Sequence, residues 1–576
     1  MVAGDNLNFP LIGQFLQNAG AFYIRRSSGG DRLYEGIVQS YVDTLLANGF
    51  NFECFIEGTR SRVGKLLPPK FGILKLIMET IIKNRASDCW IVPVSTQYDK
   101  VIEAETFVSE LLGRPKRAEN LKDFISSSSA LSLNRGRIDA RFHEPWSLRD
   151  FIEEQSRKQV LGLEMSDFSQ PTVRTRLLRS LGYKVLSDIN AVSVVMPTAL
   201  VGSVVLTCRG RGIGQQELYR RIEELIQRIK RSGGRVADFA SMSLPEIIDR
   251  ACNILKGVVG QSHDLLEPTY YPIDRFQLSF HRNQIVHLFV SEAIIAAAMY
   301  VKIKEGDEPD NQRVERGFLV QQVSFLSKLM RNEFVFDISG LRANMEHSLQ
   351  RLHDDDVFHV TDEFVELSVK ERKNGCVQYD FYRFLIWPFV ESYWVAALAL
   401  FALLPPEGQA HNGRWVQMSA FQEAAQLFAK TLYAQGDVTY LEAVNKETLK
   451  TAFASFEEEG MLVVEGGRRG REKREKRVML SPAWLDPGRQ EGLRADDSSQ
   501  SAPNLLWAFV ERIGGRSRGD AAAASGILRL AQNCGAGLKR EEDSASNSTS
   551  STSSTSSTSS STSSSTRGDR NSRARL

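Results

Sequence analysis

The amino-acid sequence predicts an α/β domain with a parallel-rich sheet, followed by a mostly helical domain and a disordered tail. Three observations support this fold class. Short apolar runs alternate with helical periodicity between residues 10 and 94, the helical period dominates beyond about residue 155, and residues 544–566 are almost wholly serine and threonine. We expect an α/β domain at 1–160, a helical domain at 161–485, a linker with short helices at 486–543, a flexible tether at 544–566 and a tail at 567–576.

The elements of the first domain follow from local spacing and from punctuating residues. Pro10 suits the first turn of a helix, and Gly20 and Gly49 suit the ends of two helices. Helices are predicted at about residues 11–19, 31–48 and 72–84, and strands at 21–24, 52–56 and 90–94. Strands joined by helical crossovers lie parallel, and ligands of such sheets bind beyond the carboxyl ends of the strands. The residues that follow each strand are therefore the candidate site.

Four arginines follow two of the predicted strands. The first strand ends at Arg25 and Arg26, and the third ends before residues 95–98. The second strand is followed by Glu57, Gly58, Thr59, Arg60, Ser61 and Arg62. Guanidinium forks and hydroxyl groups suit a phosphate monoester, and glycine allows a close approach of the backbone. This pattern predicts a small phosphorylated ligand; the alternative is that Arg25 and Arg26 form surface ion pairs with acidic helix residues.

Composition excludes several function classes. A net charge of +2 over 576 residues gives no polyanion signature, so we expect no nucleic-acid partner. The six cysteines form no CxxC pair, which is typical of free thiols in a reducing compartment.

We expect no metal site. The spacing of His281 and His287 does not place them one helical turn apart, and the acidic run after His353 is predicted to form a solvated loop. No signal peptide is expected at the amino terminus.

Two apolar stretches and one basic run bear on membranes. Residues 192–207 are apolar but short, and residues 384–404 contain Pro388 and Glu391, so neither is a clean membrane span. We expect peripheral attachment through the aromatic face of 384–404, with burial inside the helical domain as the alternative. The basic run at 468–477 would contact anionic headgroups or form a solvated hairpin tip.

Three motifs resemble a known family. Gly20-Ala-Phe-Tyr-Ile-Arg-Arg26, Phe55-Ile-Glu-Gly-Thr-Arg-Ser-Arg62 and Ile91-Val-Pro-Val-Ser95 are similar to the second, third and fourth motifs of the glycerol-phosphate acyltransferase superfamily. A weaker similarity, to the helical region of the larger enzymes, lies at Phe280-His-Arg-Asn-Gln-Ile-Val-His287. The resemblance implies acyl transfer from acyl-CoA, used as a substrate, with no cofactor. The acceptor would be the primary hydroxyl of glycerol 3-phosphate or dihydroxyacetone phosphate.

The resemblance also implies residue roles. Arg25, Arg26, Arg60, Ser61 and Arg62 would hold the acceptor phosphate, with Glu57 ordering the turn. Pro93 would shape the acyl-CoA side. The family's general base is the histidine of an HxxxxD motif, which should precede Gly20, but the first histidine here is His143. We therefore expect either an amino-terminally incomplete acyltransferase or a non-catalytic binding partner, with no catalytic residue present in this sequence.

The last three residues bear on location. Ala574, Arg575 and Leu576 form a small-basic-leucine ending of the peroxisomal type, carried on the flexible tether. This ending predicts recognition by an import receptor and membrane association on the lumenal side of the peroxisome, with mitochondrial or reticular membranes as alternatives. The peroxisomal branch of the superfamily acylates dihydroxyacetone phosphate in ether-lipid synthesis, which we expect here, with glycerol 3-phosphate as the alternative acceptor.

Overall fold

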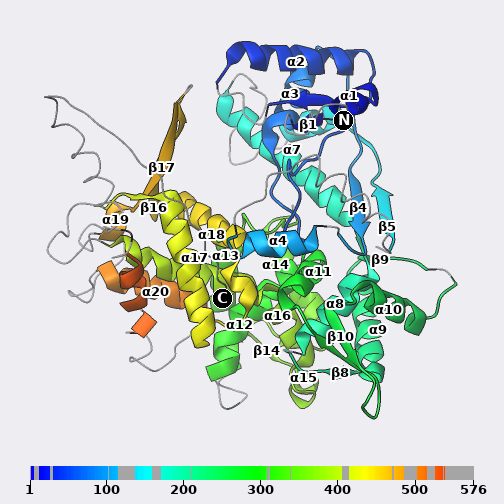
Figure 1. The fold of residues 1–576 in the computed structure, drawn as a ribbon, viewed down its shortest axis with the longest axis vertical. Helices are drawn as coiled ribbons and strands as arrows, with labels where there is room; N and C mark the ends of the chain where they lie inside the picture. Colours follow the sequence, from blue (N-terminus) through cyan, green and yellow to red (C-terminus); the bar gives the residue numbers. More distant parts are fainter. Residues whose placement is uncertain are drawn as a thin grey trace, which may run out of the picture.

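The computed structural model describes most of the chain up to residue 538. The described residues are 2–4, 12–25, 30–101, 103–114, 136–157, 170–208, 210–239, 241–305, 308, 312–337, 339–404, 414–469, 472–485, 502–514, 526–527, 529–535 and 538. Arg26, the serine- and threonine-rich stretch and residues 574–576 lie outside them, so the predictions made there stay predictions. Figure 1 shows the amino-terminal unit and the larger helical region as two parts, with α4 between them.

The amino-terminal unit begins with a parallel strand pair. Strands β1 (Val2–Gly4) and β2 (Phe22–Ile24) pair in parallel and are joined through α1 (Ile12–Asn18). Helix α2 (Arg32–Ala47) starts where the Asp31 carboxylate accepts the Tyr34 N–H, a conventional cap. Helix α3 (Phe71–Ile82) packs on α2 (Figure 1). The three helices and the first strand predicted here are confirmed; β1 was not predicted.

The rest of this unit is antiparallel. Strand β3 (Trp90–Ile91) pairs with β6 (Trp146–Ser147), and β4 (Val94–Tyr98) pairs with β5 (Ile138–Phe142). Helix α4 spans Ala104–Leu111 and helix α6 spans Leu148–Arg157. Within this unit, parallel pairing is thus confirmed only for β1 and β2. The later strands are antiparallel, because β5 runs back alongside β4 instead of following a crossover. Reading residues 95–98 as the exit of a strand was wrong, since they lie within β4.

The predicted strand at residues 52–56 is wrong. This segment pairs with no strand among the described residues. Its Phe52 ring lies 5.7 Å from the Phe22 ring, so the segment runs beside β2 without forming a ladder. Apolar periodicity reports burial on one side, whereas a strand also needs a neighbouring backbone with which to exchange hydrogen bonds.

The carboxy-terminal region is mostly helical, as predicted. Helix α7 (Pro171–Ala191) leads from the first unit into it. The helices that follow are α8 (Pro197–Thr207), α9 (Gln215–Arg231), α10 (Leu244–Ile254), α11 (Arg275–Val286), α12 (Val290–Glu305), α13 (Arg316–Leu329), α14 (Leu341–Asp354), α15 (Val369–Lys373), α16 (Val377–Ala399), η4 (Leu400–Leu403), α17 (Met418–Gln435), η5 (Leu441–Val444), α18 (Lys446–Glu458), α19 (Pro482–Leu485) and α20 (Ala502–Gly514).

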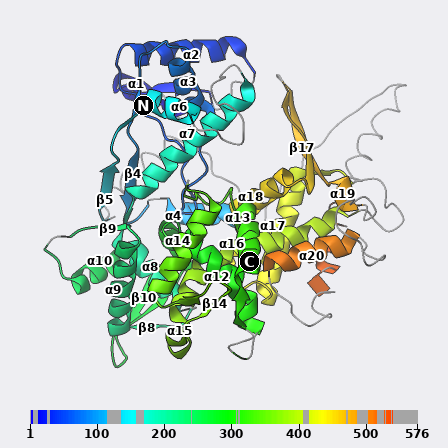
Figure 2. The same ribbon diagram turned by 180° about the vertical axis from the view of Figure 1, so that it is seen from behind.

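Small sheets in this region were not predicted. They are β7 (Val194–Val195) parallel to β9 (Arg235–Val236), and three antiparallel sheets formed by β8 (Ile213–Gly214), β10 (Val259–Ser262) and β11 (Thr269–Pro272), by β12 (Val314–Glu315), β13 (Phe358–Val360) and β14 (Phe364–Leu367), and by β15 (Val416–Gln417), β16 (Leu462–Arg469) and β17 (Glu472–Leu480). Most of these strands have two to four residues, too short to show a period of two. The β16–β17 hairpin projects beyond the helices that hold its base (Figures 1 and 2).

Helix α16 forms the centre of the helical core. Together with η4 it is long and apolar enough to cross a membrane, but its apolar window is wholly buried inside the fold. Its charged residue Glu391 accepts backbone N–H groups from Thr439 and Tyr440, and Arg383 stacks over the Trp387 ring. These contacts satisfy the polar groups within the protein. The segment at 384–404 is therefore buried inside the helical domain, which is the alternative that the sequence left open.

Candidate functional site

The residues that follow Ile56 form a closed loop. The Lys70 N–H donates to the Ile56 carbonyl at 2.7 Å, which brings the two ends of the loop together. Gly58 has a φ of +62° and its N–H donates to Phe55, and a Cβ added there would lie 2.9 Å from Lys70 Cγ. Glycine is therefore required at this turn by both its backbone conformation and its proximity to Lys70. We call residues 57–70 the motif loop.

Glu57 sits at the base of the motif loop. Burial raises the pKa of its carboxyl to about 7, although the backbone N–H of Leu67 and the charge of Lys65 act in the opposite direction. A carboxyl that accepts a hydrogen bond from the far side of the loop orders the turn, which is the role that the resemblance implies. Thr59, next to Gly58, is exposed.

Arg60 and Arg62 both pair with carboxylates of α4. Arg60 forms an ion pair with Glu103, the residue that precedes α4, and its guanidinium lies 6.0 Å from the Phe107 ring. Arg62 Nε lies 2.9 Å from Glu110 Oε2. Two guanidinium groups are thus presented from one loop toward one helix. The hydroxyl between them, Ser61 Oγ, donates to the Lys65 carbonyl at 2.6 Å and so stabilises the loop.

The motif loop docks onto the helical region at three successive residues. The Asn283 side chain donates to the Val63 carbonyl at 2.7 Å. A Cβ on Gly64, whose φ is +83°, would lie 2.2 Å from the Phe280 carbonyl oxygen. Lys65 Nζ lies 2.8 Å from Glu333 Oε2, with both side chains buried. The helical region thus shapes the backbone that carries the two arginines.

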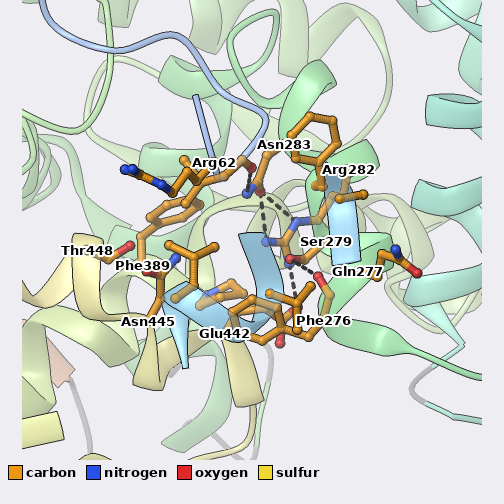
Figure 3. A pocket seen from close by; sticks show the side chains of 16 residues that line it. Arg62, Phe276, Gln277, Ser279, Arg282, Asn283, Phe389, Glu442, Asn445 and Thr448 are labelled. Atoms are coloured by element: carbon orange, nitrogen blue, oxygen red, sulfur yellow. Dashed lines mark hydrogen bonds and ion pairs between the residues drawn. The ribbon is translucent and has the colours of Figure 1, made fainter. Parts of the chain in front are cut away.

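A pocket lies at this junction (Figure 3). In Figure 3 the labelled Arg282 lies between Asn283 and Glu442, and dashed lines join it to both. Arg282 is fully buried; its Nη2 donates to Asn283 Oδ1 at 2.8 Å and its Nη1 lies 3.3 Å from Glu442 Oε1. Arg62 lines the same pocket. The buried arginine holds Asn283 in the orientation that receives the motif loop, so it is a structural cation and Arg62 is the accessible one.

The other predicted site residues lie on different elements. Arg25 pairs with Asp31 at 3.4 Å and stacks over the Tyr34 ring at 4.5 Å, at the start of α2. This is the surface ion pair that the sequence left open as the alternative for Arg25. Pro93 is buried between β3 and β4, and its carbonyl accepts the His143 N–H at 2.9 Å. Arg26 lies outside the described residues.

Two histidines, His281 and His287, lie in the segment of the helical region that resembles the larger enzymes. His281 is buried and His287 is half-buried, and desolvation lowers the pKa of each to about 4. His287 Nε2 lies 2.9 Å from Ser193 Oγ. All six cysteines are free thiols. Within the described ranges no group of three or more His, Cys, Asp or Glu side chains is arranged to hold a metal ion.

Several site residues were missed from the sequence. Gly64 and Lys65 closely follow the third motif in the sequence, and this proximity could have identified them as site residues. Glu103 and Glu110 carry no local signal, because an isolated glutamate on a short helix is usually solvated. Asn283 lies in the segment whose resemblance was noted, but its contact with the motif loop depends on tertiary structure.

Comparison with known protein families shows to which class of protein the chain belongs. Residues 1–97 match the family described as "Acyltransferase". Residues 107–465, more than half of the chain, match "Glycerol-3-phosphate acyltransferase C-terminal region". The chain therefore belongs to the glycerol-3-phosphate acyltransferase family.

Bacterial relatives give the same result. The chain is 29% identical over 352 residues to a glycerol-3-phosphate acyltransferase of Shewanella amazonensis, covering 60% of this chain and 42% of the relative. It is 28% identical over 307 residues to one of Pseudomonas fluorescens, and 29% identical over 309 residues to one of Pseudomonas entomophila, each covering 52% of this chain and 36% of the relative. The chain thus spans well under half the length of these relatives.

Proposed function

We propose that the protein transfers a fatty acyl group from acyl-CoA to the primary hydroxyl of a three-carbon phosphate. The observation that carries this proposal is the motif loop, which presents Arg60 and Arg62 toward the same helix, α4, while Lys65 anchors it to the helical region. Two guanidinium groups within three residues suit a phosphate dianion, since each fork can donate two hydrogen bonds to its oxygens. The membership of the acyltransferase family supports the reaction class.

In this proposal the described residues supply the acceptor side of the reaction. The arginines hold the phosphate and so position the hydroxyl for attack on the thioester. The general base in the family pattern is the histidine that precedes the second motif, and residues 1–142 contain no histidine. Binding of the acceptor and transfer of the acyl group are therefore measured separately below.

Two acceptors fit the proposal. The names of the relatives favour glycerol 3-phosphate. The sequence of residues 574–576 favours dihydroxyacetone phosphate, the acceptor of the peroxisomal branch. Both carry the same phosphate and primary hydroxyl, so the motif loop suits either one.

A peripheral position at a membrane is part of the proposal. Residues 465–477 of the projecting hairpin hold seven Lys or Arg and three Glu, which suits an anionic surface. Flotation with phosphatidylcholine vesicles, with and without phosphatidylglycerol, tests this. Binding that requires the anionic lipid and falls with salt supports it, and equal recovery with both vesicles contradicts it. A peroxisomal location is proposed on residues 574–576 alone; a carboxy-terminal tag that hides Leu576 should leave the protein in the cytosol.

An assay with radiolabelled palmitoyl-CoA tests the reaction. We expect lysophosphatidate from glycerol 3-phosphate, or acyl-dihydroxyacetone phosphate from the other acceptor, and no product when glycerol replaces them. Calorimetry on the same preparation reports acceptor binding. Acceptor binding without any transfer would replace the catalytic proposal with a role as a substrate-binding partner, and absence of both would contradict the phosphate site.

A further inference from the structure

Helix α4 offers a carboxylate near each end to one of the two arginines of the motif loop. Glu103, just before the helix, contacts Arg60, and Glu110, in its last turn, contacts Arg62. A carboxylate and a phosphate monoester present the same kind of anionic oxygen to a guanidinium group. Each glutamate therefore contacts a guanidinium group that the acceptor phosphate of the proposed reaction also contacts.

The two ion pairs differ in exposure. The side chains of Arg60 and Glu103 are 61% and 35% exposed, whereas those of Arg62 and Glu110 are 26% and 16% exposed. An exposed ion pair is weak because water screens it and because holding two long side chains together costs entropy. A half-buried pair is harder to break, since separating it leaves a poorly solvated charge. A phosphate dianion would exchange with the first carboxylate more readily than with the second.

The carboxyl end of α4 is held by hydrogen bonds from α17. At its carboxyl end, the Leu111 carbonyl accepts a hydrogen bond from Gln426 at 2.8 Å, and the Leu112 carbonyl accepts one from Lys430 at 2.7 Å. Leu111 is buried against Val63 in a small core. Glu110 thus lies beside the anchored end of the helix, while Glu103 lies at the opposite end.

We propose that Glu103 is an internal substitute for the acceptor phosphate on Arg60 and is displaced when the acceptor binds, whereas Glu110 stays on Arg62 as a positioning residue. This assignment deepens the proposed function, because it requires the acceptor phosphate to bind Arg60 and Arg62. The contrast follows from exposure and anchoring together. It gives the two carboxylates of one short helix opposite effects on acceptor affinity.

Calorimetric titration with glycerol 3-phosphate tests the assignment on the full chain. Glu103→Gln should lower the acceptor Kd by about two- to fivefold, the range that an exposed ion pair is worth. Glu110→Gln should raise it by about tenfold, and Glu110→Asp, which keeps the charge, should recover part of that loss. Glu53→Gln, a change at an exposed carboxylate on the preceding segment, controls for the loss of one negative charge. The Kd of coenzyme A should stay within twofold in every variant.

The outcomes separate this inference from the proposed function. If the wild-type chain binds glycerol 3-phosphate but Glu103→Gln binds it equally or more weakly, the displacement role is wrong and the phosphate site stands. An equal gain in acceptor affinity in Glu53→Gln would show that loss of any nearby negative charge strengthens binding, and it would overturn the assignment. If neither the wild-type chain nor Glu103→Gln binds, the phosphate site itself is contradicted, and the displacement role with it.

Discussion

Lys65 and Glu333 lie 268 positions apart in the sequence, yet Lys65 Nζ lies 2.8 Å from Glu333 Oε2 and 2.6 Å from the Glu333 carbonyl oxygen. Both side chains are buried, and the rings of Phe334 and Phe389 lie 5.5 and 5.8 Å from the ammonium group. Burial raises the pKa of Glu333, and the neighbouring Lys65 charge opposes that rise. This pair joins the motif loop to the helical region.

Lys65→Met should destabilise the protein strongly. Removing one partner leaves the other charge buried and uncompensated, which costs about 3–5 kcal/mol. Urea unfolding followed by tryptophan fluorescence measures the loss. Lys370→Met, which breaks the exposed pair with Asp356, is the matched control and should cost less than about 1 kcal/mol. Equal costs for the two variants would show that the Lys65 pair does not hold the two parts together.

Gly64→Ala should weaken acceptor binding and lower the melting temperature. Its φ of +83° disfavours a side chain, and the new Cβ would lie 2.2 Å from the Phe280 carbonyl oxygen, so the motif loop must move away from α11. Gly36→Ala within α2 is the control, because a Cβ there meets nothing within 4 Å. It should be neutral or stabilising by about 1 kcal/mol. A Gly64→Ala variant with unchanged melting temperature and acceptor Kd would contradict the docked loop.

Glu57→Gln should change the pH dependence of stability. The folded-state pKa of Glu57 is raised to about 7 from 4.5, so the folded protein binds more protons than the unfolded chain between these values. Stability conferred by the protonated carboxyl is complete below pH 4.5 and is lost as the pH rises through 7. Relative to Glu57→Gln, the wild-type protein should therefore lose stability between pH 5 and pH 8. Melting temperatures at both pH values give the comparison, and a constant difference would argue against a buried Glu57.

Local signals in the sequence were sufficient for much of the fold. The α2 and α3 helices were predicted because each repeats apolar residues at helical spacing between recognisable ends. The strand at residues 52–56 was not, because strand pairing depends on a neighbour that the local pattern does not contain. The apolar run at 384–404 fits a membrane interface or a core equally well by composition, and only the contacts of Glu391 distinguish the two.

The residues of the candidate site also divide into those with a local sequence signal and those that depend on tertiary contacts. Arg60 and Arg62 were predicted because their motif is compact and specific. Their partners Glu103 and Glu110, and the Lys65–Glu333 pair, were not, because these contacts join segments that are distant in the sequence. Arg25 was grouped with them on the assumption of parallel strands, and the structure instead pairs it with Asp31.

The most direct test of the phosphate site is the affinity of glycerol 3-phosphate for Arg60→Lys and Arg62→Lys. Lysine keeps the positive charge but loses the planar fork, so we expect the acceptor Kd to rise at least tenfold while the Kd of coenzyme A changes less than twofold. Arg220→Lys, in an exposed helical ion pair of α9, controls for arginine substitution elsewhere. An acceptor Kd that is unchanged in both motif-loop variants would contradict the assignment of the motif loop as the phosphate site.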